Sequence, residues 1–342
     1  MRRVMERASS WGLLSLALAL VSCTSSSSRL ATTQGPFRDL AQPGPCVIDQ
    51  QGSLLCWGPP RRTRLDVDGP ARLSSGRDLV CAEAAAGGLR CWHMEVQVGS
   101  GAAFVPFALP QLESPRQLAS DAGRHCALQA DGTVVCWSRL APELRPVANV
   151  VGARQIDIFV RNACALLSTG RVVCWSPSKE DPAGLLASSR EVPGLAQAQQ
   201  IALGSFFGCA VLTDGGVSCW GNGNMGELGR PVAPFVPHPA ARVPGLSRIA
   251  QVVASGHTAC ARSIDGAVSC WGRNMACELG VKKRKVGDLS EHPIVVQGLE
   301  PSQKLSFDGR MVCSLSKAGN LTCWGGCLDN DDNDPNVRLP PD

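Results

Sequence analysis

The sequence predicts an all-β fold, a seven-bladed β-propeller made of four-stranded antiparallel blades. One observation is a unit that occurs seven times, in which two cysteines lie ten positions apart and Trp follows the second. A second is its period: from Cys56 to Cys323 the unit recurs in six steps over 267 residues, about 44 residues per step. Room for four short strands in a period of about 40–50 residues is typical of a propeller blade.

Each repeated unit is predicted to form a β-hairpin. The third unit, residues 126–137, has apolar residues alternating on both sides of an Asp131-Gly132 pair, which is a strong hairpin signal. A three-residue loop ending in a left-handed residue fits this spacing, and glycine adopts positive φ at little cost. This explains why Gly lies six residues after the first Cys in all seven units.

The hairpin register places the two cysteines of each unit opposite each other. Directly opposed Cα atoms in an antiparallel pair lie ~4.5–5.5 Å apart, which a disulfide tolerates. Buried free thiols are the alternative, because Cys packs well as a small apolar residue. The predicted disulfides are Cys46–Cys56, Cys81–Cys91, Cys126–Cys136, Cys164–Cys174, Cys209–Cys219, Cys260–Cys270 and Cys313–Cys323.

The segments before the hairpins supply the other two strands. Before the fifth and sixth hairpins, Val-Pro-Gly-Leu separates two short segments, and we assign both to the blade of the hairpin that follows. Because the first unit has only a short lead-in, closure is expected from the other end of the chain. We predict that Val337 and Leu339, within 335–342, pair with the first blade and seal the ring, which removes two exposed edges.

The first 22 residues are predicted to be a lipoprotein signal peptide. Basic residues precede an apolar segment, 11–21, that is too short to span a bilayer. It ends in Leu-Val-Ser-Cys, which resembles the bacterial lipoprotein box, so Cys23 is the predicted lipidation site; an ordinary cleaved signal is the alternative. Residues 23–35 are expected to be a flexible Ser-rich tether, and 36–342 the propeller.

Cysteine usage indicates an exported protein, and the net charge bears on its partners. Of 17 Cys, 16 remain when Cys23 is set aside, and an even number suits an oxidising compartment. Outside the hairpins, Cys277 and Cys327 could form a further disulfide or remain two free thiols. Thr24 rather than Asp follows Cys23, so we expect anchorage at the outer membrane of a bacterial cell envelope. The net charge of +4 argues against nucleic acid as a partner.

Three phrases resemble the regulator-of-chromosome-condensation repeat family: residues 219–229, 256–266 and 267–280. The resemblance covers about residues 36–342 and implies a seven-bladed propeller. The eukaryotic founder of the family is a nucleotide exchange factor for a small nuclear GTPase and binds chromatin, but no stretch here matches its exchange interface. Secreted bacterial relatives include an inhibitor that clamps β-lactamases, which favours binding over catalysis by analogy of fold.

No motif in the sequence indicates an enzyme or a resident cofactor. None of the five histidines has metal-ligand spacing with another. No Gly-rich phosphate loop opens a helix, and no serine has a nucleophile-elbow context.

Two loops that interrupt the repeat are candidate binding loops. The first is basic, the second is acidic, and solvated surface loops are the alternative for both. Their residues are Lys282, Lys283, Arg284 and Lys285 in one, and Asp329, Asp331, Asp332 and Asp334 in the other. Oxygen ligands at Asp329, Asp331 and Asp334 suit Ca²⁺ weakly, because the Gly and terminal Glu of an EF-hand are missing.

We therefore expect a monomeric, lipid-anchored, non-enzymatic scaffold that binds a protein or glycan partner through its rim loops. Such loops on a rigid frame are common carriers of function. The alternatives are a hydrolase or lyase with its site in the central channel, and a purely structural component of the envelope.

Overall fold

The computed structural model describes most of the chain from residue 31 to residue 325. The described residues are 31–33, 37–41, 46–58, 61–65, 67, 72–76, 78–83, 89–97, 101–109, 112, 115–121, 123–138, 141–160, 162–176, 189–281, 288–309 and 311–325.

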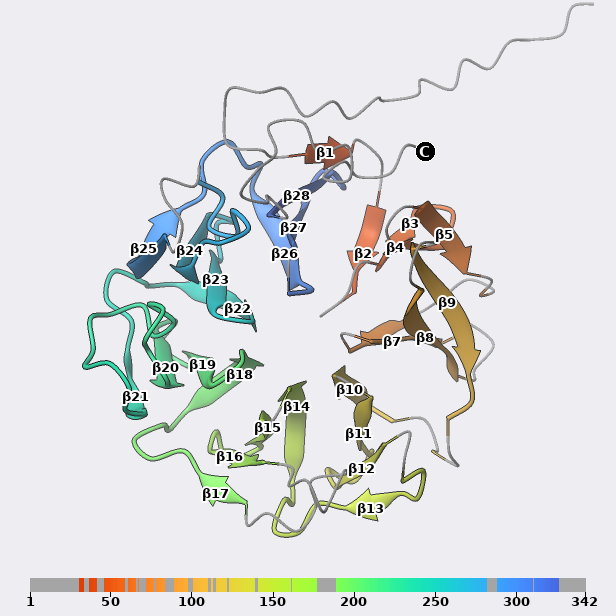
Figure 1. Ribbon diagram of the computed structural model, residues 1–342, viewed down its shortest axis with the longest axis horizontal. Helices are drawn as coiled ribbons and strands as arrows, with labels where there is room; N and C mark the ends of the chain where they lie inside the picture. The colour runs from red at the N-terminus through yellow and green to blue at the C-terminus, as the bar shows by residue number, and fades with distance from the viewer. Residues whose placement is uncertain are drawn as a thin grey trace, which may run out of the picture.

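Seven four-stranded antiparallel sheets form a closed ring around a central channel (Figure 1). All the regular elements among the described residues are strands, so no helix there could cross a membrane. The predicted all-β, seven-bladed propeller is confirmed. In each blade the first strand lies nearest the channel and the fourth lies at the outside (Figure 1).

The first four blades are continuous in sequence. Blade 1 has β2 (Phe37–Leu40), β3 (Cys46–Asp49), β4 (Leu54–Gly58) and β5 (Arg61–Leu65). Blade 2 has β6 (Arg72–Ser75), β7 (Leu79–Glu83), β8 (Leu89–Gln97) and β9 (Gly101–Phe107). Blade 3 has β10 (Gln117–Asp121), β11 (Arg124–Leu128), β12 (Val134–Ser138) and β13 (Arg145–Pro146). Blade 4 has β14 (Ala153–Phe159), β15 (Asn162–Leu167), β16 (Val172–Trp175) and β17 (Arg190–Glu191).

Blades 5 and 6 follow the same order, whereas blade 7 joins the two ends of the chain. Blade 5 has β18 (Ala198–Leu203), β19 (Phe207–Leu212), β20 (Val217–Gly221) and β21 (His238–Arg242). Blade 6 has β22 (Ile249–Ser255), β23 (Thr258–Ser263), β24 (Val268–Arg273) and β25 (Leu289–Val295). Blade 7 has β26 (Ser302–Phe307), β27 (Met311–Ser316), β28 (Leu321–Gly325) and β1 (Ala31–Thr33).

The assignment of strands to blades differs from the prediction by one strand. The strand before each Pro-Gly turn was assigned to the blade that follows, but β21 pairs with β20 of blade 5, and only β22 belongs to blade 6. The turn therefore connects two blades. Local alternation of apolar residues predicts a strand but does not say which neighbour it pairs with.

Ring closure changes for the same reason. Blade 1 has all four strands within 37–65, so it needs no added strand. Residues 302–325 give blade 7 only three strands, so its fourth strand comes from elsewhere in the chain. The closing strand is β1, whose Thr32 lies opposite Thr322 of β28. The predicted pairing of Val337 and Leu339 lies outside the described residues. The predicted flexible tether, 23–35, contains this closing strand.

The hairpins have the predicted register. In all seven, the two cysteines lie opposite each other and are joined by a disulfide, with Cα–Cα distances of 4.0 or 4.1 Å. In the third hairpin Leu128 also lies opposite Val134. The turn glycine Gly132 has φ +83°, and a Cβ there would come 3.0 Å from the Cα of Gly152 in the next blade. Glycine is thus needed both for the turn and for the close approach of two blades.

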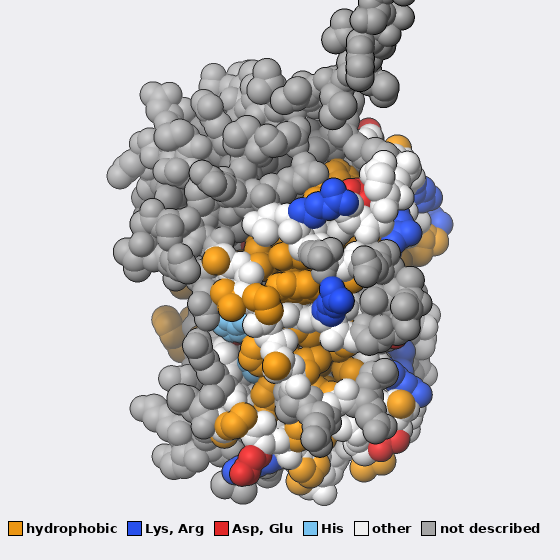
Figure 2. Space-filling model, turned by 90° about the vertical axis from the view of Figure 1, so that its right-hand side faces the viewer, with side chains coloured by type: hydrophobic (Ala, Val, Ile, Leu, Met, Phe, Trp, Pro, Cys, Tyr) orange, Lys and Arg blue, Asp and Glu red, His pale blue; other side chains and the backbone are white. Residues whose placement is uncertain are grey.

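The ring has two faces, which we name by their connections. The loop face carries the connections from first to second strand and from third to fourth strand of each blade. The turn face carries the hairpin turns and the connections between blades. The hydrophobic core consists of clusters between neighbouring blades, such as the one that joins Cys209 and Cys219 to Trp271. A side view over blades 1–3 shows hydrophobic side chains near the middle, with basic ones above them and toward one edge (Figure 2).

Candidate functional site

The structure places the predicted site residues unevenly. The fourteen hairpin cysteines are paired within their own blades. Cys277 is half-buried, while its predicted partner Cys327 lies outside the described residues, so that pairing stays a prediction. The lipidation site and both candidate binding loops also lie outside them, namely Cys23, Lys282, Lys283, Arg284, Lys285, Asp329, Asp331, Asp332 and Asp334. Among the described residues, no cluster of three or more His, Cys, Asp or Glu could hold a metal ion.

Two loop-face connections insert a leucine between neighbouring blades. After β20, the segment Gly226-Glu-Leu-Gly229 buries Leu228 completely in the cluster formed by Cys209, Cys219 and Trp271. After β24, the matching Leu279 is equally buried against Trp324. We call each of these leucines, with the carbonyl that precedes it, a leucine plug.

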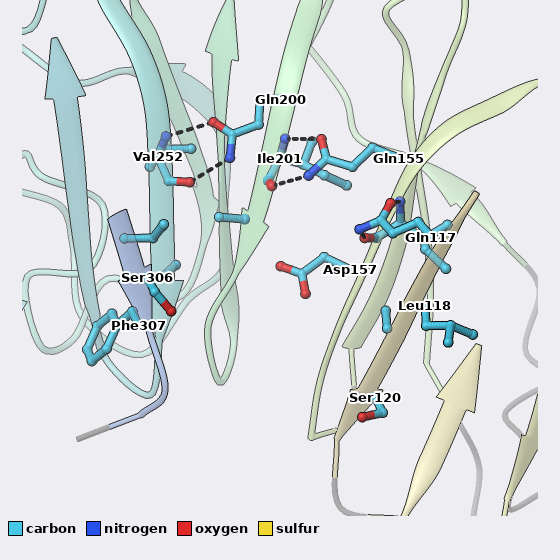
Figure 3. Close-up of a pocket in the computed structure, with 15 residues that line it drawn as sticks. Gln117, Leu118, Ser120, Gln155, Asp157, Gln200, Ile201, Val252, Ser306 and Phe307 are labelled. Atoms are coloured by element: carbon cyan, nitrogen blue, oxygen red, sulfur yellow. Dashed lines mark hydrogen bonds between the residues drawn. The ribbon is translucent and has the colours of Figure 1, made fainter. Parts of the chain in front are cut away.

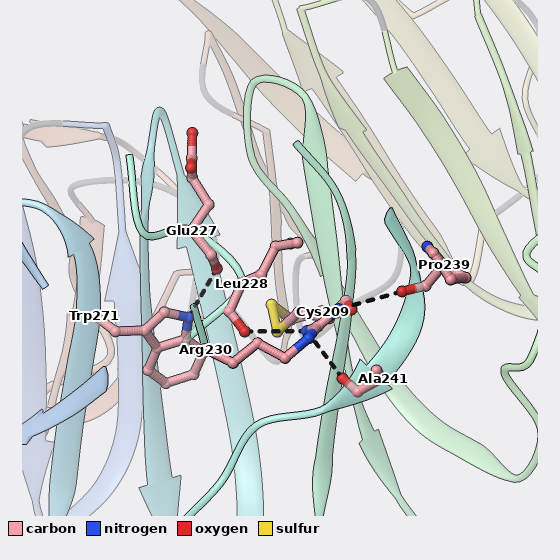
Figure 4. The surroundings of a disulfide bond; sticks show 8 residues. Cys209, Glu227, Leu228, Arg230, Pro239, Ala241 and Trp271 are labelled. Carbon is pink, nitrogen blue, oxygen red and sulfur yellow. Dashed lines mark hydrogen bonds between the residues drawn. A yellow bond between two sulfur atoms is a disulfide. The ribbon is translucent and has the colours of Figure 1, made fainter. Parts of the chain in front are cut away.

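Each leucine plug is fixed by the tryptophan of the next blade. Trp271 Nε1 donates to the carbonyl of Glu227 at 2.8 Å (Figure 4). Trp324 Nε1 donates to the carbonyl of Glu278 at 2.9 Å. Both rings are almost completely buried. The plug therefore satisfies the indole N–H and fills the space beside the ring, which are the two requirements for burying Trp at low cost.

Side chains around the first plug hold the loop in place. The buried Glu227 carboxylate lies 2.8 Å from Nδ1 of His257 and accepts from the backbone N–H of Met225 at 2.7 Å. Arg230 Nη1 donates to the carbonyls of Leu228 at 3.3 Å and of Ala241 at 3.2 Å (Figure 4). Partial burial lowers the pKa of Arg230.

The junction between blades 4 and 5 has an open pocket at the corresponding place. Its volume is about 460 Å³, within the ~300–1,000 Å³ typical of ligand sites. The lining residues are Asn162, Cys164, Cys174, Trp175, Ser176, Arg190, Leu203, Phe206, Phe207 and Trp220.

Burial shows that this pocket takes the place of a leucine plug. Trp220 is half-exposed, whereas its counterparts Trp271 and Trp324 are 0% and 2% exposed. Within the described residues, Trp220 Nε1 has no hydrogen-bond partner. Cys174 is half-exposed too, while the second cysteine of each other hairpin is buried.

Exposed apolar side chains lie on the loop face of blades 4 and 5, and one of them, Phe206, lines the pocket. Phe235 is 85% exposed and Phe206 is 52% exposed. Phe235 also has φ +63°, a strained conformation for a bulky residue, and its N–H donates to Oδ1 of Asn224. Three further residues of this group are Val160, Met225 and Val236.

The channel is lined by a ladder of glutamines that sequence analysis missed. Gln155 Nε2 donates to the carbonyl of Ile201 at 2.9 Å, and its Oε1 accepts from the N–H of the same residue at 2.9 Å (Figure 3). Gln200 makes the same pair of hydrogen bonds with the backbone of Val252 (Figure 3). Gln117 with Ile156 and Gln251 with Leu305 repeat it. All four glutamines lie nine residues before a first hairpin Cys, a signal that was present in the sequence.

In blade 7 the position equivalent to these glutamines carries an ion pair instead. Lys304 lies nine residues before Cys313, and its Nζ is 2.6 Å from Oδ1 of Asp39 in blade 1. Inside the ring is a hollow of about 80 Å³ whose lining has one ionisable side chain, Asp157. Its carboxylate accepts from the backbone N–H groups of Ile158 and Leu203, each at 2.8 Å.

The junction between blades 2 and 3 is filled by aromatic rings and histidines. His125 is buried 5.4 Å from the ring centres of both Phe107 and Trp137. Burial lowers the pKa of His125 to about 4, with Asp78 opposing the shift and His93 adding to it. His125 is therefore neutral at physiological pH.

One segment of the chain, residues 198–227, matches the model of the Regulator of chromosome condensation (RCC1) repeat. The chain carries RCC1-type repeats. Prp20p from Saccharomyces cerevisiae, a yeast RCC1, is similar with TM-score 0.64 at 16% identity, over 86% of this chain and 83% of that one. Human WBSCR16 is similar with TM-score 0.62 at 14% identity, over 82% and 83% of the two chains.

The ectodomain of the Arabidopsis thaliana receptor kinase ACR4 is also similar, with TM-score 0.53 and 16% identity over 86% of this chain and 98% of that one. None of the curated proteins compared with the chain matches it. Identities this low show a shared fold. The Prp20p structure is described together with the binding of that protein to Gsp1p and histones.

Proposed function

We propose that this protein is a lipid-anchored, envelope-exposed scaffold, without enzymatic activity, that binds a protein or glycan partner through its loop face. The observation that carries the proposal is the group of exposed apolar side chains on the loop face of blades 4 and 5, above all Phe206, which lines the open pocket, and Phe235. Exposed apolar side chains beside a pocket are typical of interaction sites. A ring with a disulfide in every blade is a rigid frame for such a surface.

We propose that the two candidate binding loops also contribute to the loop face. Residues 282–285 connect β24 to β25, and 329–334 follow β28, so both segments start where a third strand reaches the loop face. Their opposite charges would give one rim a basic and an acidic part. We retain them as contributors to partner selection.

The alternative of a channel enzyme finds less support. The glutamine amides of the lining are engaged by the next blade, and Asp157 is engaged by two backbone N–H groups. General acid–base chemistry needs positioned groups that can exchange protons with a substrate. A binding surface on the loop face, in contrast, needs only side chains that are exposed there, such as Phe206 and Phe235.

Affinity capture from the envelope of the same organism tests the proposal. The bait is the mature soluble chain, residues 24–342, purified from an oxidising compartment; it starts before β1 because that strand completes blade 7. The double variant Phe206→Ser/Phe235→Ser is compared with Val151→Ser/Ile264→Ser, which removes exposed apolar groups on the turn face.

A selective partner that is lost only with the loop-face variant is the expected result. The absence of any selective partner would contradict the proposal and favour a structural envelope component. For the anchor, the Cys23→Ser chain is expected to leave the detergent phase, and its retention there would contradict lipidation.

A further inference from the structure

The pocket between blades 4 and 5 lies where a leucine plug would be. The plugs place leucine eight residues after the hairpin tryptophan, as Leu228 follows Trp220 and Leu279 follows Trp271. At the same distance after Trp175 the sequence has Ala183, and the connection lacks Gly-Glu-Leu-Gly.

The pocket walls match those that receive the plugs. At the junction of blades 5 and 6, Leu228 lies in one cluster with Cys209, Cys219 and Trp271. The equivalent residues Cys164, Cys174 and Trp220 line the pocket. Trp220 therefore offers an apolar ring and an indole donor to a leucine and the carbonyl before it.

Close approach to the tryptophan also selects the residue after the leucine. Gly229 has φ +63°, and a Cβ there would come 2.7 Å from Cγ1 of Val243 and 3.1 Å from Nε1 of Trp271. At the junction of blades 4 and 5, Val192 occupies the position equivalent to Val243, since both N–H groups donate to the equivalent third strand, and Trp220 packs against its cluster. A ligand leucine beside Trp220 is therefore best followed by glycine.

Two substitutions make the pocket differ from a plug site. Phe206 takes the place of His257, three residues before the first Cys, so the imidazole that faces Glu227 is replaced by an apolar ring. Arg190 lies opposite Cys174, where Ala241 lies opposite Cys219.

Arg190 selects charge at one ligand position. In blade 5, Arg230 follows Leu228 by two residues and reaches the carbonyl of Ala241. Arg190 occupies the place of Ala241, is exposed, and has no ion-pair partner among the described residues. A basic residue two positions after the leucine would be repelled there, and a carboxylate would be attracted.

We infer that this pocket binds a loop of a partner protein that carries Leu-Gly followed by Asp or Glu. The inference rests on the scaffold function proposed above and names the chemistry of its partner. The leucine lies against Trp220 and Phe206, the carbonyl before it accepts from Trp220 Nε1, and the carboxylate pairs with Arg190. The partner thus supplies from outside what blades 5 and 6 supply to their own junctions.

A peptide copied from the chain's own plug tests this directly. The probe is a cyclised peptide with the sequence of residues 222–229 followed by Asp, titrated by calorimetry into the full chain purified in detergent with its disulfides formed. Two matched peptides carry Ser in place of the leucine or Arg in place of the final Asp. Saturable binding of the probe, weakened about tenfold or more by the leucine change, is expected because anchor residues dominate small interfaces.

Variants of the chain assign the contacts. Phe206→Ser is expected to weaken binding about tenfold, whereas Ile264→Ser, an exposed apolar residue of the turn face, leaves it unchanged. Arg190→Gln is expected to remove the preference for Asp over Arg at the last peptide position while retaining the leucine dependence. Unchanged melting temperatures serve as the folding control.

Several results would overturn the inference. One is the absence of saturable peptide binding, and another is an equal loss with Phe206→Ser and Ile264→Ser. A third is peptide binding only after Leu185→Ser/Leu186→Ser, which would show that the chain's own connection occupies the pocket. Binding of oligosaccharides in place of the peptide would also overturn it. If the peptide fails while affinity capture still depends on Phe235, the scaffold function stands and the pocket assignment falls.

Discussion

The junctions of blades 5–6 and 4–5 have the same walls but different contents. In the first, Leu228 and the carbonyl of Glu227 bury Trp271 completely. In the second, Trp220 and the Cys164–Cys174 disulfide face a pocket of about 460 Å³. The comparison teaches that these two junctions present equivalent walls, and that at the junction of blades 5 and 6 the chain's own leucine fills the space between them.

The junction of blades 2 and 3 shows a third solution. There, His125 and Phe107 fill the space beside Trp137. Within the described residues, Nε1 of Trp137 has no hydrogen-bond acceptor. Filling by rings thus gives burial without the hydrogen bond that the leucine plug provides.

Removing a plug should have the largest effect. Leu279→Ala is expected to lower the free energy of unfolding by about 3 kcal/mol, because it leaves a cavity in the cluster around Trp324. Denaturant unfolding measures this, with the exposed Val236→Ala as the control. A loss equal to that of the control would show that the plug does not hold the junction.

Acid should weaken the ring-filled junction next. The lowered pKa of His125 means that the unfolded chain binds a proton below pH 6.5, while the folded chain binds it only near pH 4. Stability is therefore complete above pH 6.5 and falls between pH 6.5 and 4, by at most about 3 kcal/mol. Melting temperatures across this range measure the effect; His125→Gln should flatten the profile, and the exposed His292→Gln should not.

The disulfide of the open junction should be reduced before the disulfide of the filled junction. Cys174 is half-exposed while Cys219 is buried, so a mild reductant reaches the Cys164–Cys174 bridge before the Cys209–Cys219 bridge. Loss of one such short loop costs about 2–3 kcal/mol in the chain-entropy account. Timed alkylation with peptide mapping measures the order, and labelling of Cys219 before Cys174 would contradict the difference between the junctions.

The glutamine ladder should contribute least and equally at both junctions. Gln200→Ala and Gln155→Ala each remove two hydrogen bonds to the next blade, and each is expected to cost about 1–3 kcal/mol. Denaturant unfolding of both variants measures the losses. If only one variant is destabilised, the ladder is not the common element that the comparison assumes.

Much of this architecture follows from local sequence signals. The fixed position of Gly132 and its equivalents, and the ten-residue spacing of the cysteines, predict the hairpins and their register correctly. Pairing of the fourth strand was not predictable in this way, because β21 has no feature that distinguishes blade 5 from blade 6. The closing strand β1 has the same ambiguity, and only the count of strands in blade 7 resolves it.

The pocket could not be predicted, because its sequence signal is the lack of a leucine eight residues after Trp175. In the sequence, Leu228 and Leu279 stood out only as part of segments that resemble the repeat family. Its role appears when the structure places both side chains against the next tryptophan, and only then does Ala183 become informative. The glutamine ladder was visible as a spacing, but its double hydrogen bonds depend on the distance between blades.

The most direct test of the account is competition for the captured partner. The cyclised Leu-Gly-Asp peptide is added to the complex of the mature chain with whatever its envelope supplies, and the bound fraction is measured. The account predicts that the partner is displaced by this peptide and not by the peptide with serine in place of leucine. A complex that resists both peptides but is lost with Phe235→Ser would contradict the claim that the unfilled junction is the binding site.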